Sequence, residues 1–188
     1  VAHLGHLTHS LAVSVRGVVA LAGFGRGLGH LHGLADEGLD GLGDGARTAL
    51  LVAAANDAAD VDPVLAALGV LGLERRDLEA VETAGLLAID GTRMEFRHPL
   101  VRSSVYQAAD PAQRRAVHRA LAAALGDGGE ASTVRRAWHL ALTVVGHDEA
   151  VATVLERAAT SAGQRGAFVA AAHAWERAGR LSPDPEAT

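Results

Sequence analysis

The amino-acid sequence predicts a mainly α-helical fold, and three observations lead to this prediction. Hydrophobic residues make up 49% of the 188 residues but aromatic residues only 3%, so Ala, Leu and Val must form the core. A core of small and aliphatic side chains favours closely packed helices. From residue 46 onward, apolar residues recur in regular segments that Pro opens and Gly closes, as helices require.

The charged residues and the missing residue types exclude several kinds of function. The formal net charge is −5, which argues against a general nucleic-acid-binding surface. All 17 basic residues are Arg, so the chain has no P-loop Lys, no Schiff-base Lys and no Ser-x-x-Lys nucleophile. Cysteine is absent as well, which excludes disulfides, thiol catalysis and cysteine-ligated zinc.

The first 45 residues differ from the rest in composition. They contain 11 of the 22 glycines and five of the ten histidines. Glycine at this density weakens helices, so we expect residues 1–45 to be an atypical or poorly ordered segment. Its most apolar stretch, Leu11–Phe24, is interrupted by Arg16, is too short to span a bilayer and follows no basic signal-peptide region. We therefore expect a cytoplasmic protein that does not contact a membrane.

Residues 46–97 predict three helices followed by a β-hairpin. The expected helices are Ala46–Ala59, Asp62–Val70 and Glu74–Ala84, and the expected strands are Leu86–Ile89 and Arg93–Phe96. Asp62 and Pro63 form a typical helix start, and Gly85 is a typical helix stop. Asp90 and Gly91 lie between two short apolar runs, which indicates a tight turn. This order of elements is that of a small winged-helix domain.

Residues 98–188 predict an array of helices. The expected helices are His98–Ala108, Asp110–Leu125, Ser132–Val145, Glu149–Ala162 and Arg165–Leu181. The last two show a tetratricopeptide-like spacing at Leu155, Ala159, Ala171, Trp175, Ala178 and Pro183. In such a repeat, small residues lie where the two helices touch, and one large ring fills the remaining gap. Since one repeat cannot bury its own face, we expect further repeats beyond Thr188.

A continuous string at the junction of these two regions resembles a known family. It runs from Phe96 to Tyr106 (FRHPLVRSSVY), and supporting pieces occur in order as RTALLVAAA from Arg47, ETAGLL from Glu82 and RAWHLA from Arg136. Over residues 46–188 the chain resembles the segment that follows the ATPase domain in large ATP-binding LuxR-type transcriptional regulators, which are signal-transducing NTPases with numerous domains. The resemblance implies an ATPase core upstream and a DNA-binding helix-turn-helix downstream, neither of which is visible here. The chain is thus expected to be an internal fragment or a truncated reading frame.

The resemblance also implies ligands and partners for the parent protein. ATP or ADP would bind to its ATPase domain, this domain would be the partner of the present chain, and a protein or a small molecule would act as inducer. The chain itself is expected to hold no cofactor, no metal and no catalytic residue. It contains neither a Gly-x-Ser-x-Gly nor a His-Glu-x-x-His motif, so we do not expect an enzyme.

His98 is the main candidate for a binding role. In related switch ATPases, a His at this junction contacts the phosphate of the bound nucleotide and holds the closed, inactive form. Backbone N–H groups at the start of the following helix also favour an anion. Arg97 and Arg102 flank His98, and the planar guanidinium of Arg suits phosphate recognition. All three contacts require the ATPase domain. Alternatively, His98 caps the helix that it begins or packs beneath the wing.

Other charged groups carry further hypotheses. Arg114, Arg115 and Arg119 predict a solvated helix face or, alternatively, a docking surface for an acidic partner domain. The third expected helix has more acidic than basic residues, so direct nucleic-acid binding is not expected. Histidines recur at every third position over His3–His9, as zinc or nickel ligands can, but their glycine-rich context predicts an unstructured run.

Four rings could also form a pocket between the helices. They belong to Tyr106, Trp138, His139 and Trp175, and they predict either core packing or a small-molecule site. For Tyr106 we expect a buried ring whose hydroxyl bonds to a helix end.

Two functions follow from these observations. The first is a non-catalytic regulatory module that couples the ATPase domain of a nucleotide-switched transcription regulator to a helical sensor region. The alternative is a free-standing helical module for protein–protein interaction. An upstream P-loop and a downstream helix-turn-helix in a longer reading frame would distinguish the first from the second.

Overall fold

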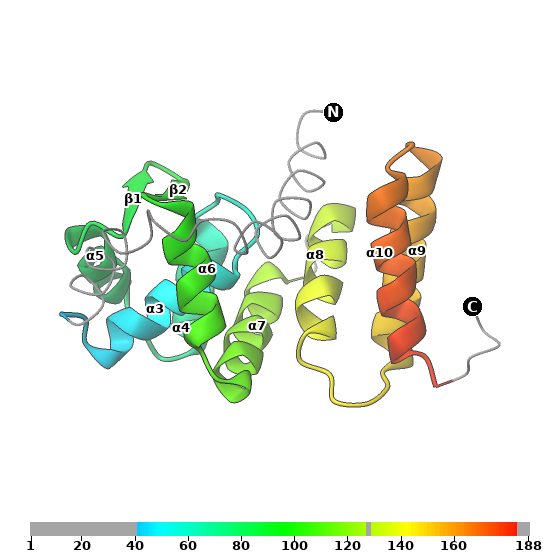
Figure 1. The fold of residues 1–188 in the computed structure, drawn as a ribbon, viewed down its shortest axis with the longest axis horizontal. Coiled ribbons are helices and arrows are strands. Elements are labelled where there is room, and N and C mark those ends of the chain that lie inside the picture. The colour runs from blue at the N-terminus through cyan, green and yellow to red at the C-terminus, as the bar shows by residue number, and fades with distance from the viewer. Residues whose placement is uncertain (1–40, 127–128, 184–188) are drawn as a thin grey trace, which may run out of the picture. The chain divides into compact units, whose positions relative to one another are not determined.

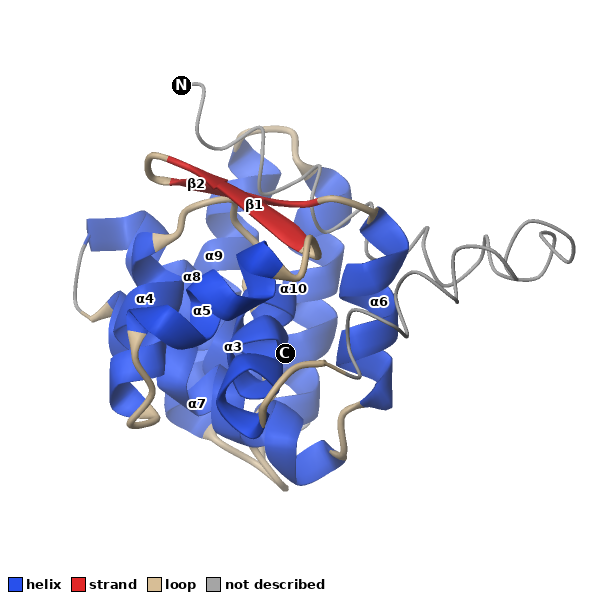
Figure 2. Ribbon diagram, turned by 90° about the vertical axis from the view of Figure 1, so that its left-hand side faces the viewer, coloured by secondary structure: helices blue, strands red, loops and turns tan. Residues whose placement is uncertain are grey.

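The structure, a computed structural model, describes residues 41–126 and 129–183 of the 188-residue chain (Figure 1). Within these ranges it contains eight α-helices and one two-stranded sheet (Figure 2). The predicted mainly α class is thus confirmed. The described residues form two compact units, which meet in the sequence at residues 117 and 118. In these ranges, no helix is both long enough and apolar enough to cross a membrane.

The first unit is built around one buried helix. Its elements are α3 (Asp44–Ala55), α4 (Asp62–Val70), α5 (Arg75–Thr83), β1 (Leu87–Asp90), β2 (Arg93–Phe96) and α6 (Pro99–Ala108). Every residue of α3 from Ala49 to Ala55 is buried, and α4, α5 and α6 each pack against this helix. A helix that is apolar on all sides is stable only inside a core, so α3 is the central helix of the unit.

Local sequence signals fix the ends of α4 and α5. Helix α4 begins at Asp62 with Pro63 in its first turn, as predicted. Helix α5 begins with a capping box, in which the Asp77 carboxylate accepts a hydrogen bond from the Glu74 backbone N–H at 2.9 Å. Gly85 follows α5 at φ 72°, a left-handed conformation that glycine adopts without steric cost.

The predicted hairpin follows α5. Strands β1 and β2 are antiparallel, with Leu87 opposite Phe96 and Ile89 opposite Met94. Gly91 takes φ 60° in the turn between them, as this kind of tight turn requires.

Both outer edges of this hairpin make further hydrogen bonds. On the β2 side, the Met94 N–H donates to the Ala59 carbonyl at 2.6 Å, so the connection between α3 and α4 runs beside β2. On the β1 side, the Ile89 N–H donates to the Glu82 carboxylate of α5 at 2.9 Å. The hairpin is therefore held from both sides.

Helix α3 ends earlier than the sequence predicted. Its last residue is Ala55 rather than Ala59. The cause is Asn56, whose Nδ2 donates to the carbonyl oxygens of Ala58 at 2.8 Å and Asp60 at 3.1 Å. An Asn side chain that bonds to nearby backbone competes with continuation of the helix. The residues after it can then pair with β2.

The second unit contains three complete helices. Helix α7 (Pro111–Leu125) begins in the first unit and ends in the second, which continues with α8 (Gly129–Ala141), α9 (Glu149–Gln164) and α10 (Phe168–Leu181). Helices α9 and α10 form a hairpin, and α8 packs against α9 (Figure 1). Their shared core consists of Ala137, Ala141, Val151, Ala152, Leu155, Ala178 and Leu181.

The predicted division into residues 1–45, 46–97 and 98–188 stays a prediction. Of the first segment, the structure describes only residues 41–45. Helix α6, which follows residue 97, packs against α3 within the first unit.

The bounds of α8 differ from the prediction. The helix spans Gly129–Ala141 rather than Ser132–Val145. At its C-terminal end, Thr143 Oγ1 donates to the Leu140 carbonyl at 2.8 Å, and this bond turns the chain away from the helix. A side-chain bond of this kind leaves no signal in the apolar spacing from which the helix was predicted.

The α9–α10 turn also differs slightly from the prediction. Helix α9 continues to Gln164 rather than ending at Ala162, and α10 begins at Phe168 rather than Arg165. Gly166 lies between the two helices at φ 76°, and it is this residue that separates them.

Candidate functional site

His98 lies between β2 and α6 and caps the helix that it begins. Its ring Nδ1 accepts a hydrogen bond from the Leu100 backbone N–H at 3.2 Å. Because Nδ1 accepts, the neutral ring carries its proton on Nε2, which is then its donor. Pro99 has no N–H, and the Val101 N–H donates to the His98 carbonyl at 3.1 Å. The first backbone donors of α6 are therefore used within the chain.

Arg102 connects α6 to the end of α3. Its Nε donates to the Ala54 carbonyl at 3.0 Å, and its Nη2 donates to the Asn56 carbonyl at 2.7 Å. These carbonyls lie at the C-terminal end of a helix, where partners are missing and positive charge is favourable. Burial lowers the pKa of the Arg102 guanidinium, while the nearby Asp57 raises it in part.

Arg97 has a different environment from its two neighbours in the motif. Its side chain is exposed, and its backbone N–H donates to the Leu86 carbonyl at 3.1 Å. Among the described residues, no hydrogen bond joins the side chains of Arg97, His98 and Arg102. The structure thus gives Arg102 a contact with α3 and His98 a capping bond, and the predicted phosphate contacts stay a prediction.

Arg114 is only partly solvated. Its Nε donates to the Ala109 carbonyl at 3.0 Å, and its guanidinium lies 5.6 Å from the centre of the Tyr106 ring. Burial raises the pKa of the Tyr106 hydroxyl, and the charge of Arg114 lowers it in part. Of the predicted basic cluster, Arg119 is exposed, whereas Arg114 and Arg115 are half-buried.

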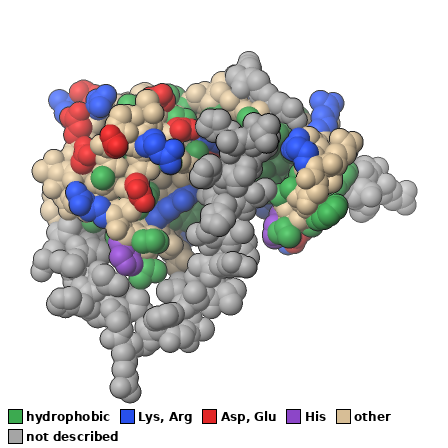
Figure 3. Space-filling model, turned by 90° about the horizontal axis from the view of Figure 1, so that it is seen from above, with side chains coloured by type: hydrophobic (Ala, Val, Ile, Leu, Met, Phe, Trp, Pro, Cys, Tyr) green, Lys and Arg blue, Asp and Glu red, His purple; other side chains and the backbone are tan. Residues whose placement is uncertain are grey.

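Acidic and basic side chains are interspersed on the surface of the first unit (Figure 3). On α5, Arg75 forms an ion pair with Glu79 at 3.0 Å, and Arg76 forms one with Glu74 at the same distance. Each guanidinium of this helix therefore has an acidic partner beside it. Exposed pairs of this kind contribute little to stability.

The predicted histidine run over His3–His9 lies outside the described residues. Within the described ranges, no group of three or more His, Asp or Glu side chains is placed to hold a metal ion.

A buried histidine pair was not predicted from the sequence. His118 on α7 and His139 on α8 are 3% and 4% exposed, and their Nδ1 atoms lie 3.0 Å apart. At this distance one Nδ1 must donate and the other accept. The two residues are 21 positions apart in the sequence, so no local sequence pattern predicts the pair.

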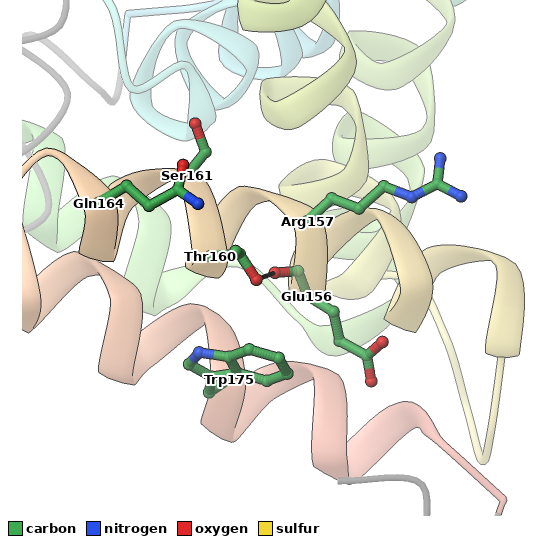
Figure 4. A pocket seen from close by; sticks show the side chains of 6 residues that line it. All are labelled: Glu156, Arg157, Thr160, Ser161, Gln164 and Trp175. Carbon is green, nitrogen blue, oxygen red and sulfur yellow. Dashed lines mark hydrogen bonds between the residues drawn. The ribbon is translucent and has the colours of Figure 1, made fainter.

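Trp175 lines an open hollow on the α9–α10 hairpin (Figure 4). The hollow has a volume of about 380 Å³, and its other lining residues are Glu156, Arg157, Thr160, Ser161 and Gln164. Trp175 is 42% exposed, so the expectation that this ring packs in the core is wrong. The buried face of α10 consists instead of Ala171, Ala174, Ala178 and Leu181, so small residues and one Leu make the contact with α9.

Comparisons with protein-family models, with curated proteins and with solved structures found no match for this chain. The family resemblance of the sequence therefore remains a prediction.

Proposed function

We propose that the chain is a non-catalytic regulatory piece of a nucleotide-switched transcription regulator of the LuxR type. In this proposal, residues 46–97 act as a winged-helix unit that closes against the ATPase domain of the parent protein. The helices after residue 97 belong to a sensor region, to which a protein or small-molecule inducer binds. ATP or ADP binds to the parent and not to the chain alone.

The observation that carries this proposal is the junction between the hairpin and α6. Three helices and a hairpin, which is the element order of a winged helix, lead directly into a helix that begins at His98. The capping bond leaves Nε2 as the donor of the neutral ring, and a phosphate oxygen is a suitable acceptor for it. Arg97 next to it is exposed and offers a guanidinium.

Arg102 supports the proposal in another way. It is a positioning residue, because its bonds to the Ala54 and Asn56 carbonyls hold α6 in place against α3. A movement of His98 when nucleotide binds to the parent protein would thereby be transmitted through α6 to α3, the central helix of the first unit. The phosphate contact predicted for Arg102 stays a prediction beside this positioning role.

The test separates capping from phosphate binding in the parent protein. His98→Ala removes both the cap and the Nε2 donor, whereas His98→Asn keeps a good capping residue and removes that donor. We expect both variants to release ADP faster and to need less inducer for transcription. If only His98→Ala does so, while His98→Asn matches the wild type, His98 is a cap and the phosphate role is wrong.

A free-standing protein-interaction module is the second candidate. It is favoured by the exposed rings of α10, where Phe168 is 73% and Trp175 42% exposed. The reading frame around the chain distinguishes the two candidates. A P-loop upstream and a helix-turn-helix downstream would support the regulator, and a complete short frame with neither would support the module.

A further inference from the structure

Helix α10 has an apolar face that nothing in the described residues covers. It consists of Phe168, Ala172, Trp175 and Gly179, which recur at spacings of four, three and four residues and are all exposed. We call these four residues the α10 strip. The adjoining face of α10 packs against α9 through Ala171, Ala174, Ala178 and Leu181. The apolar arc of this helix is therefore wider than its contact with α9 requires.

Large and small residues alternate along the α10 strip. Consider two antiparallel copies of α10, related by a two-fold axis that passes midway between Ala172 and Trp175. Phe168 of one copy then lies opposite Gly179 of the other, and Ala172 lies opposite Trp175. Each ring meets a small residue of the partner, so the strip is complementary in shape to itself, as a two-fold interface requires. We propose that the α10 strip is a homodimer interface and that its occupant is a second copy of this chain.

The exposed area corresponds to a weak dimer that forms only at high concentration. Phe168 is 73% exposed, Trp175 42% and the adjoining Val169 70%. Since an aromatic side chain carries about 150–250 Å², two copies that bury the exposed parts of both rings would remove roughly 350–580 Å² of aromatic surface from water. Val169 adds a smaller aliphatic area. The interface thus falls in the range below ~1,200 Å² in which weak, transient contacts lie.

The charges around the strip also fit this occupant. The strip itself has no charged side chain, so a nucleic acid or a strongly charged protein finds no counter-charge there. On its polar side, Glu176 pairs with Arg180 at 2.5 Å within the same helix, so its charge is already compensated. In addition, antiparallel helices place the positive end of one dipole beside the negative end of the other.

The experiment is sedimentation of the full chain at concentrations from about 5 to 200 µM. For an interface of this size we expect a monomer–dimer equilibrium with a midpoint of tens of micromolar. Trp175→Ala should weaken association at least tenfold because it removes the largest ring. Ala172→Trp should also weaken it, because two rings then meet across the axis.

The decisive variant exchanges the two residues. Ala172→Trp combined with Trp175→Ala restores a ring opposite a small residue, so it should recover most of the dimer that each single change loses. Val145→Ala is the matched control, since Val145 is 84% exposed and lies outside the strip; it should leave association unchanged. Circular dichroism of each variant verifies the fold.

Two results would overturn the proposal. A chain that stays monomeric at 200 µM shows that the strip does not bind a second copy. A dimer that both single variants leave intact, or that the exchange fails to rescue, shows that association uses a different surface.

Discussion

The guanidinium of Arg102 bonds to two backbone carbonyls that lie 48 and 46 residues earlier in the chain. Arg102→Met keeps much of the side-chain volume but leaves these carbonyls at the end of α3 without that partner. Hydrogen bonds to charged groups contribute about 1.5–3 kcal/mol each, and burial makes their loss costly. We expect the free energy of unfolding to fall by about 2–4 kcal/mol, measured by urea denaturation.

Arg97→Met is the matched control for this prediction. Its side chain is exposed, so the same chemical change should alter stability by no more than about 0.5 kcal/mol. Equal losses for both variants would contradict the positioning role of Arg102.

The pair of His118 and His139 joins α7 to α8 by a buried hydrogen bond. The two rings are 3% and 4% exposed, and their Nδ1 atoms lie 3.0 Å apart. Replacing one ring by an apolar side chain removes this bond from the other ring, and losing a buried hydrogen-bond partner costs about 1–3 kcal/mol.

Urea denaturation measures this effect. We expect His118→Leu to lower the free energy of unfolding by about 1–3 kcal/mol. His147→Leu is the control because His147 is exposed, so the same change should alter stability by no more than about 0.5 kcal/mol. Equal losses in both variants would refute the role of the pair.

At the scale of helices, α3 and α5 meet at a glycine. A Cβ at Gly45 would clash with the Oδ1 atom of Asp77, whose other oxygen caps α5. Gly45→Ala should therefore disturb this cap and lower stability by about 1 kcal/mol, although Ala is the better helix former. Gly69→Ala in α4 is the matched control: a Cβ there meets nothing within 4 Å, so it should raise stability by about 0.5–1 kcal/mol.

Thermal denaturation of both glycine variants measures the difference. Adding Asp77→Ala removes the clash together with the cap, so Gly45→Ala in that background should no longer destabilise. If Gly45→Ala stabilises the wild-type chain as Gly69→Ala does, the proposed clash between a Cβ at position 45 and the Asp77 carboxylate is wrong.

Most elements could be predicted from the sequence because local residues define them. Pro63 opens α4, Gly85 follows α5, and Gly91 forms the hairpin turn, each at the position that the sequence indicated. What could not be predicted depends on side-chain bonds with no regular spacing. The side-chain bonds of Asn56 and Thr143 lie just after the last residues of α3 and α8, although apolar residues continue beyond both.

The candidate site was predictable only in part, and for the same reason. His98 next to Pro99 is a local helix-start pattern, and its capping role was one of the two alternatives considered. The contacts of Arg102 and of the His118–His139 pair join segments far apart in the chain, so they depend on how whole helices pack. Trp175 was expected in the core because of its spacing, but small residues of α10 occupy the face that packs against α9.

At the scale of the whole chain, the proposed function predicts no tight nucleotide binding without an ATPase domain. The chain has no Lys, and the first backbone donors of α6 are used by His98. Calorimetric titration with Mg-ATP and with Mg-ADP should show no binding in the sub-micromolar range and no hydrolysis. A dissociation constant below 1 µM, which corresponds to about −8 kcal/mol, would contradict this assignment.

The bonds on both sides of the β-hairpin also limit how the molecule aggregates. A strand with an open edge can recruit further chains without end, which is the usual route to fibres. Here Ala59 bonds to Met94 on one edge, and the carboxylate of Glu82 accepts the Ile89 N–H on the other. Both edges of the hairpin thus make bonds within the chain. If the chain associates through the proposed α10 strip, the two-fold contact closes after two copies, so we expect pairs rather than growing polymers at high concentration.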